Sequence, residues 1–322
     1  EYIFSTYNTP YIDASLLSHI QAIPIKQLKK ERNAVILAHN YVASELQDIA
    51  DVLGDSLQLS IEASKIGAPV IVFCGVSFMA ETAKILSPNS KVLLPVKTAG
   101  CPMADMATGE AVAEFRRTHP DHVLVAYVNS TAAVKAEVDI CCTSANAEKI
   151  VAAIPRDKKI MFLPDRNLGR NVAKALNREM EFWPGYCPIH NAITVAEVEA
   201  IKQENPGMEF LVHPECTPEV VALADKALST GGMLKYIRES DKSGFIVGTE
   251  CGIMHRLQIE NPTKVLIPFK PTPTCVDMKK LGLADVLACL EAPLENNPYE
   301  VILDEELMDK ARRPIQRMLE FK

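Results

Sequence analysis

The sequence predicts an α/β protein of three homologous three-layer αβα domains, whose parallel sheets surround a pseudo-threefold axis. Three observations support this prediction. An apolar run occurs three times, starting at Asn33, Asp121 and Gly207, so that the copies begin 88 and 86 residues apart. In each copy, strand-like runs alternate with helix-like runs, which is the pattern of parallel βαβ units. A repeat of this length is too long for a solenoid and suits a small domain.

The elements of the first copy follow from its hydrophobic pattern. Residues 35–38 are aliphatic and predict a strand, and the helical pattern from residue 43 to 53 predicts a helix. A tight segment ending at Ser56 interrupts that pattern, and a second helix starts at once. The copy closes with a strand, a helix and a last extended run, at 69–75, 78–86 and 91–95.

The second and third copies repeat this order. The second has strands at 123–126 and 159–165 and helices at 131–138, 145–154 and 168–176. A tight segment at 141–144, which ends at Ser144, separates its first two helices, and an extended run at 180–184 closes the copy. The third has strands at 210–212 and 244–250 and helices at 217–228, 231–240 and 252–260. Its tight segment at 228–230 ends at Thr230, and its extended run lies at 264–268.

Linkers of matched size separate the copies, and each carries one helix pattern. They span 102–120 and 188–206, and a third such helix follows Cys275. We therefore expect a first domain of residues 1–101 plus 276–322, with N- and C-terminal helical extensions packed on it. The second domain is expected at 102–187 and the third at 188–275.

Composition and charge argue against several classes of protein. The chain is 48% hydrophobic and 23% charged, as in an ordinary globular protein. Its net charge of −7 gives no basis for binding nucleic acid. No apolar run approaches the roughly 20 residues that cross a bilayer, and the N-terminal residues do not look like a secretory signal. We expect a cytoplasmic protein without nucleic-acid or membrane partners.

Three of the nine cysteines stand apart from the others. The odd count and wide spacing argue against a disulfide framework. Cys101, Cys187 and Cys275 each end one copy, in a Pro- or Gly-rich loop where packing does not require cysteine. The remaining six are assigned a structural role: Cys74, Cys141, Cys142, Cys216, Cys251 and Cys289.

Three thiolates that meet at one site would form a metal centre. Spacing alone leaves zinc and an iron–sulfur cluster open. Structural zinc usually draws pairs of cysteines from one short loop, whereas these cysteines come from three repeats, which favours a larger object on the symmetry axis. A cluster held by three cysteines keeps one iron free to act as a Lewis acid.

Polar residues recur where the first strand of each copy ends, which is where open parallel sheets bind ligands. They are His39 and Tyr41, Tyr127 and Asn129, and His213 and Glu215. Ser56, Ser144 and Thr230 are expected at helix starts, as caps, as anion-binding groups or as both. The histidines and Glu215 are candidates for acid–base or anion-binding roles, and His190 for support of the metal.

The chain resembles the quinolinate synthase family, iron–sulfur enzymes of de novo NAD biosynthesis, over nearly its whole length. The resemblance rests on long motifs in the same order: ILAHNY (36–41), GDSLQL (54–59), GVSFMAETAKIL (75–86), AGCPMADM (99–106), AYVNSTAAVKAEVD (126–139), CTSANA (142–147), GYCPIH (185–190), HPEC (213–216), LSTGGM (228–233), VGTECGI (247–253) and CVDMK (275–279).

This resemblance implies a [4Fe–4S] cluster on Cys101, Cys187 and Cys275. It also implies that iminoaspartate, supplied by an aspartate-oxidising enzyme, condenses with dihydroxyacetone phosphate to give quinolinate, phosphate and two waters. Catalysis would use Tyr41, Glu215, His39 and His213. The substrates would contact His39, Ser56, Tyr127, Asn129, Ser144, His213, Glu215, Ser229 and Thr230.

Three other functions fit this pattern less well. A three-cysteine hydro-lyase would use the open iron to dehydrate a hydroxy acid, and its product would be an alkene acid rather than a pyridine dicarboxylate. A non-catalytic metal sensor would leave the polar residues at the strand ends without a use. A radical enzyme that uses S-adenosylmethionine would be expected to carry its three cysteines in one loop.

Overall fold

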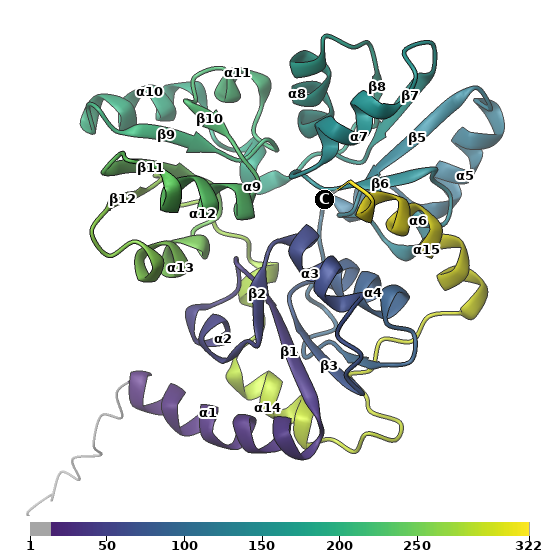
Figure 1. Ribbon diagram of the computed structural model, residues 1–322, viewed down its shortest axis with the longest axis vertical. Helices are drawn as coiled ribbons and strands as arrows, with labels where there is room; N and C mark the ends of the chain where they lie inside the picture. Colours follow the sequence, from purple (N-terminus) through teal and green to yellow (C-terminus); the bar gives the residue numbers. More distant parts are fainter. Residues whose placement is uncertain (1–13, 322) are drawn as a thin grey trace, which may run out of the picture.

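The computed structural model describes residues 14–321, and these residues form three four-stranded sheets, arranged as three lobes around a common centre (Figure 1). All strand pairs within the sheets are parallel. The predicted fold class is therefore confirmed. The division of the chain at residues 101, 187 and 275 stays a prediction.

The three sheets share one strand order. The first is β2 (Val52–Gly54), β1 (Ala34–His39), β3 (Val70–Cys74) and β4 (Lys91–Leu93). The second is β6 (Ile140–Cys142), β5 (His122–Tyr127), β7 (Lys159–Leu163) and β8 (Glu181–Phe182). The third is β10 (Lys226–Ala227), β9 (Glu209–Val212), β11 (Gly244–Gly248) and β12 (Val265–Pro268).

Helices connect these strands and cover the sheets. In the first lobe they are α2 (Ser44–Ile49), α3 (Ser56–Ala63) and α4 (Ser77–Leu86). In the second they are α6 (Ala132–Lys135), α7 (Ala147–Ala153) and α8 (Arg166–Leu176), and in the third α11 (Pro218–Val221), α12 (Thr230–Glu239) and α13 (Ile253–Glu260). The linkers hold the predicted helices α5 (Gly109–Thr118) and α10 (Val195–Glu204), and the third such helix, α14 (Leu283–Glu291), follows Cys275.

The short strand at one edge of each sheet differs from the sequence prediction. We expected a helix up to residue 53, but α2 ends at Ile49, and residues 52–54 form β2 beside β1. The equivalent strands β6 and β10 also pair with the first strand of their sheet. Such short strands exist because a neighbouring strand supplies their hydrogen-bond partners, and a local pattern does not record that neighbour.

One aspartate in each lobe fixes the connection into this edge strand. Asp51, Asp139 and Asp225 each accept a hydrogen bond from a backbone N–H of the lobe's first strand, 15 residues earlier, at 2.7 to 2.8 Å. The carboxylate thus provides an acceptor for a backbone donor of this inner strand, next to where the short edge strand begins. These three aspartates are a further element of the threefold repeat.

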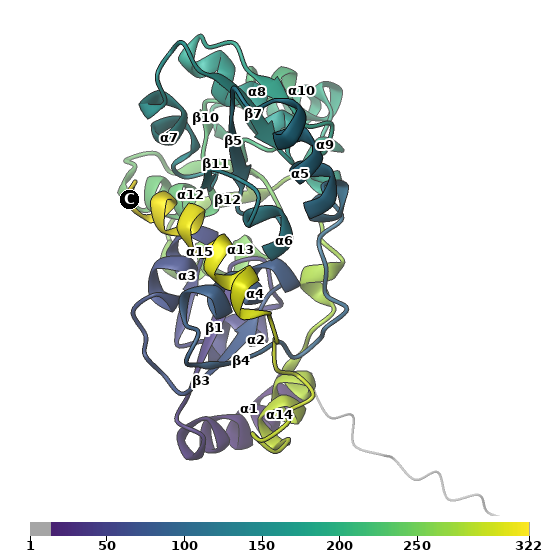
Figure 2. The ribbon, with the colours of Figure 1, turned by 90° about the vertical axis from the view of Figure 1, so that its right-hand side faces the viewer.

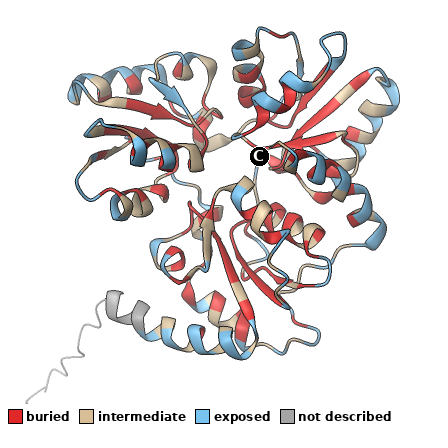
Figure 3. Ribbon diagram, in the orientation of Figure 1, coloured by how far each residue is buried: buried red, intermediate tan, exposed pale blue. Residues whose placement is uncertain are grey.

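The central strands form the core of each lobe. Every residue of β3 is buried, and Figure 3 shows that burial is concentrated along the central strands, whereas the outer helix faces are exposed. Continuous apolar strands are typical of parallel sheets covered by helices on both faces. Among the described helices, none combines the length and the apolar character required to cross a bilayer.

The extensions lie on two lobes rather than one. Helix α1 (Ala14–Glu31) packs against α14 at the far end of the first lobe (Figure 2), whereas residues 1–13 lie outside the described part. We expected the C-terminal helix on the first domain as well. Instead α15 (Glu305–Leu319) packs mainly on α6 and β6 of the second lobe and also touches α4. Its apolar face, with Met308, Ile315 and Met318, belongs to the second lobe's core.

Candidate active site and metal centre

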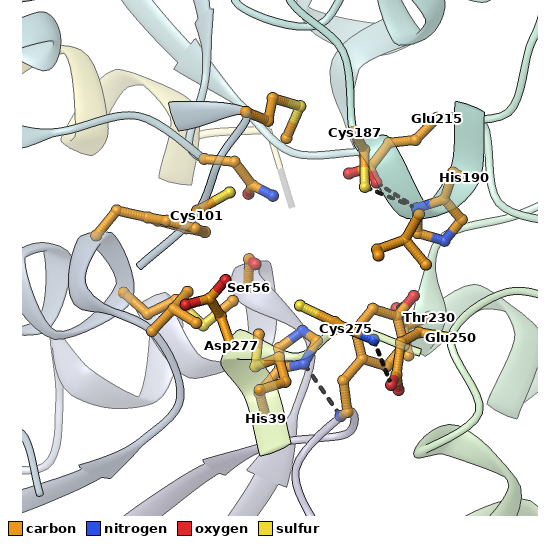
Figure 4. A pocket seen from close by; sticks show the side chains of 18 of the residues that line it. His39, Ser56, Cys101, Cys187, His190, Glu215, Thr230, Glu250, Cys275 and Asp277 are labelled. Carbon is orange, nitrogen blue, oxygen red and sulfur yellow. Dashed lines mark hydrogen bonds and ion pairs between the residues drawn. The ribbon is translucent and has the colours of Figure 1, made fainter. Parts of the chain in front are cut away.

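The carboxyl ends of strands from all three sheets border one cavity. Its walls include residues of all three repeats, among them His39, Tyr127 and His213, each of which follows or ends the first strand of its sheet. Figure 4 shows side chains of this lining, among them His39, Ser56 and Thr230, around a shared space. This is the ligand position expected for parallel sheets.

The three repeat-ending cysteines line this same cavity. Cys101, Cys187 and Cys275 lie in different lobes or linkers, and each precedes a short helical turn: η1 (Ala104–Met106), α9 (Pro188–Asn191) and η2 (Asp277–Lys279). The three thiols therefore occupy equivalent positions and face a common centre.

Each of these thiols accepts hydrogen bonds from the backbone of the turn that follows it. The donors are Met103 and Ala104 for Cys101, His190 for Cys187, and Asp277 and Met278 for Cys275. Backbone N–H groups directed at sulfur stabilise a thiolate and tune metal–sulfur clusters.

Burial opposes ionisation of these thiols when no metal is bound. It raises the pKa of Cys101 to about 12 and also raises the pKa of Cys187 and of Cys275. A bound metal would reverse this preference, since metal ligation deprotonates thiols.

Five of the six cysteines that we assigned a structural role are buried, and none of these five has exposed surface. Cys251 differs, because it is partly exposed and its Sγ lies 3.6 Å from the hydroxyl of Thr274. It does not line the central cavity.

A second group of potential ligands surrounds Cys187. The ligand atoms of Cys187, His190 and Glu215 all lie within 4.8 Å of one another. Nδ1 of His190 is 3.3 Å from the Cys187 sulfur and 2.7 Å from Oε2 of Glu215. The sequence analysis named His190 as a candidate for support of the metal, and in the structure its ring contacts the Cys187 sulfur.

His39 and His213 have matching surroundings. In each case Nδ1 accepts a hydrogen bond from the backbone N–H two residues later, of Tyr41 at 3.2 Å and of Glu215 at 3.3 Å. Nδ1 therefore carries no proton, and the neutral ring carries its proton on Nε2. Burial lowers the pKa of His39 to about 3 and that of His213 to about 4, so both rings are neutral donors at pH 7.

Glu215 lies at the centre of a buried polar network. Its Oε1 accepts the Tyr127 hydroxyl at 2.5 Å, and its Oε2 faces His190. Burial by itself would raise the pKa of Glu215, but attraction to the His213 and His190 imidazoles and the hydrogen bonds from His190 and Tyr127 hold that pKa below its usual range. The carboxylate is therefore ionised and accepts protons.

The phenol of Tyr41 belongs to the same network. Its oxygen is 2.7 Å from the Thr249 hydroxyl and accepts the Thr230 hydroxyl at 3.0 Å. Burial, and then the charge of Glu215, raise the pKa of Tyr41, so the phenol keeps its proton. The pKa of Tyr127 is raised by the same two causes.

The predicted helix-start residues divide into two groups. Ser56 and Thr230 are the first residues of α3 and α12, whose N-caps are Asp55 and Ser229. Ser144 lies in the turn before α7, whose N-cap is Asn146. None of the three hydroxyls is used as an N-cap, and all three line the cavity. Ser229 does not line it, because its hydroxyl caps α12 and contacts Asp55.

Asn129 also lines the cavity, and its Oδ1 is buried without a partner among the described residues. Buried amide oxygens are normally hydrogen-bonded. This acceptor is therefore available to a ligand.

Sequence reasoning missed several residues of the site. Glu250 is 1% exposed, accepts the backbone N–H of Cys275 at 3.0 Å and pairs with Lys279 at 2.9 Å. Asp277 accepts the backbone N–H of Gly100, which links the Cys275 loop to the Cys101 loop. Thr249 joins Tyr41 to His190. The rule that ligands lie beyond strand ends would have found Thr249 and Glu250, because both directly follow β11.

Known proteins resemble this chain over most of its length. A family profile described as Quinolinate synthetase A protein (NadA) matches residues 24–320. A quinolinate synthase of Geobacter metallireducens is 52% identical over 92% of this chain and 95% of its own length. Those of Alkaliphilus metalliredigens and a Dehalococcoides mccartyi strain are 48% and 49% identical, over 92% and 94% of this chain and 97% and 98% of their own lengths. The chain therefore belongs to the quinolinate synthase family of enzymes.

Proposed function

We propose that this enzyme is a quinolinate synthase of NAD biosynthesis, which condenses iminoaspartate with dihydroxyacetone phosphate to give quinolinate, phosphate and two waters. The observation that carries the proposal is the shared cavity. Three cysteines and nine polar residues from matched places in three repeats line it together. Iminoaspartate would come from an aspartate-oxidising enzyme, and the cytoplasm is the expected compartment.

The residues present fit a [4Fe–4S] cluster on Cys101, Cys187 and Cys275. All three thiols face the cavity, and the backbone of a short turn donates hydrogen bonds to each sulfur. Soft thiolates are the ligands that such clusters take. When bound, a cluster with three protein ligands supplies a Lewis acid at its fourth iron.

The alternative ligand group of Cys187, His190 and Glu215 mixes sulfur, nitrogen and oxygen, as a zinc site can. This ligand group does not account for the backbone N–H groups that donate to the sulfurs of Cys101 and Cys275. The three-cysteine set accounts for all three loops, so we favour it and give His190 and Glu215 roles beside it.

The substrates carry two carboxylates and one phosphate, and the cavity offers matching groups. Helices α3 and α12 begin at its wall, and the free N–H groups at a helix start favour anions. His39 and His213 would donate from Nε2, and Asn129 would use its unpaired oxygen. We assign substrate contacts to His39, Ser56, Tyr127, Asn129, Ser144, His213, Glu215 and Thr230, with Ser229 contributing through the helix start that it caps.

Proton transfers would use groups already in the right ionisation state. Glu215 is an ionised carboxylate and would remove protons during isomerisation and ring closure. Tyr41 keeps its proton and, with His39 and His213, would return protons to the leaving oxygens. Burial of the network excludes water from these transfers and strengthens its hydrogen bonds.

The test is anaerobic purification with iron and sulfide analysis, beside an assay of quinolinate from dihydroxyacetone phosphate and enzymatically generated iminoaspartate. We expect about four irons and four sulfides per chain and a pyridine dicarboxylate as product. Zinc in place of iron, or an iron-loaded protein that makes no quinolinate, would contradict the proposal.

A further inference from the structure

Thr249 joins Tyr41, a candidate catalytic group of the first lobe, to His190, which lies beside Cys187 and Glu215. Its hydroxyl lies 2.7 Å from the Tyr41 phenol oxygen and 2.8 Å from Nε2 of His190. On the other side of the ring, His190 Nδ1 lies 2.7 Å from Oε2 of Glu215 and 3.3 Å from the Cys187 sulfur, contacts drawn in Figure 4. Thr249 is 2% exposed and lies behind the cavity wall, so it does not meet the substrates itself.

The chemistry of the end group fixes the direction of these hydrogen bonds. A carboxylate only accepts, so the proton between His190 and Glu215 belongs to Nδ1. In the neutral ring Nε2 is then an acceptor, and the Thr249 hydroxyl must donate to it. The remaining lone pair of that hydroxyl accepts the Tyr41 phenol. The bonds therefore run in one direction, from Tyr41 through Thr249 and His190 to Glu215.

The backbone around Thr249 is held by other contacts. A Cβ on Gly252 would lie 2.6 Å from the carbonyl oxygen of Tyr41, so the two loops touch directly. The Gln47 side chain donates to the carbonyls of Gly252 and Val42, at 2.8 and 2.9 Å. Loss of the Thr249 hydroxyl would therefore change the hydrogen bonds of Tyr41 and His190 while the loops stay in place.

We propose that Thr249 is a positioning residue of the reaction, whose hydroxyl orients the Tyr41 phenol and keeps the His190 proton on Nδ1, facing Glu215. The kinetic part of this inference rests on the proposed function. The part that concerns the His190 ring does not. Thr249 is the one partner that the described chain gives to Nε2 of His190, so no other side chain takes over its task.

The variants Thr249→Val and Thr249→Ser separate this role from packing. Valine keeps the shape of threonine and removes the hydroxyl, whereas serine keeps the hydroxyl and removes a methyl group. A packing role predicts that serine is the more harmful change, and a positioning role predicts that valine is.

The first measurement is ¹⁵N NMR of the histidine rings in the cluster-free full-length protein at pH 7, with His190 assigned through His190→Gln. We expect the Nδ1–H form of His190 in the wild type and in Thr249→Ser, and a loss of that preference in Thr249→Val. A wild-type ring protonated on Nε2 would overturn the proposal without any variant. So would an unchanged ring in Thr249→Val.

The second measurement is turnover of the cluster-loaded enzyme. A buried group left without its partner typically costs enough to slow a reaction about tenfold or more. We expect kcat of Thr249→Val to fall about tenfold with little change in KM and in iron content, and Thr249→Ser to stay near the wild type. Equal kcat in the two variants would overturn the positioning role. A wild type that makes no quinolinate would contradict the proposed function instead, while the NMR result still decides the role of Thr249.

Discussion

Replacement of Glu215 by glutamine tests the centre of the site. The carboxylate is 4% exposed and accepts the Tyr127 hydroxyl at 2.5 Å and a proton of His190 at 2.7 Å. Glutamine has nearly the same shape but is neutral, and its amide nitrogen would face one of these two donors. The variant therefore loses one charge-assisted hydrogen bond and gains a donor opposite a donor.

The size of both effects follows from this geometry. A hydrogen bond to a charged group contributes about 1.5 to 3 kcal/mol to stability, so we expect Glu215→Gln to lower the free energy of unfolding by about 2 kcal/mol. Removal of a general base slows a reaction by about 10² to 10⁴, which corresponds to roughly 3 to 5 kcal/mol in the barrier. Expressed as free energies, the effect on the reaction barrier should therefore exceed the effect on the stability of the fold.

The assay compares quinolinate formation, cluster absorbance and thermal unfolding of wild type and variant. Glu209→Gln is the matched control, because Glu209 also accepts a tyrosine hydroxyl, that of Tyr236 at 2.9 Å, but lies away from the cavity. We expect intact cluster absorbance in both variants and lost turnover in Glu215→Gln alone. Turnover of Glu215→Gln within about twofold of the wild type would refute the role of Glu215 as the base.

Three further predictions follow from other contacts. Glu250→Ala removes the carboxylate that pairs with Lys279 and accepts the Cys275 N–H, so it should lower stability by about 3 kcal/mol and reduce iron content. Glu306→Ala, at the exposed pair with Lys310, should change stability by under about 0.5 kcal/mol. Unchanged iron content and melting temperature in Glu250→Ala would contradict this prediction. Each of Cys101→Ala, Cys187→Ala and Cys275→Ala should lose the iron signal, while Cys251→Ala keeps it. If one of the three variants still binds iron, the cysteine that it lacks is not a ligand. His39 and His213 have pKa values lowered to about 3 and 4 in the folded protein, so the unfolded chain binds more protons below pH 6.5. The free energy of unfolding of the cluster-free protein should therefore fall by about 1.4 kcal/mol per histidine for each pH unit between pH 6.5 and 4. Denaturant unfolding at pH 7 and pH 5 checks this, and His213→Asn should show a shallower fall; an equal fall in that variant would exclude His213 as a cause.

Much of the architecture was predictable because it is encoded locally and repeated. Each copy of the repeat contains the same order of apolar strands and helices, and the central strands lie where the aliphatic runs predicted them. Cys101, Cys187 and Cys275 could be singled out because they recur at one place in the repeat, and one repeat position leads to one place in a symmetric fold. The edge strand β2 could not be predicted in this way, since its three residues become a strand through pairing with β1.

The three α/β lobes, the three cysteines and the polar residues at the strand ends could be predicted from the chain, because hydrophobic period and repeat position are local properties. The packing of α15 on the second lobe, and the link that Thr249 makes between Tyr41 and His190, became evident in the folded protein alone. Tyr41 and Thr249 are 208 residues apart. Contacts between residues so distant depend on how three sheets pack against one another, and that packing is set by surfaces which exist only after each lobe has folded.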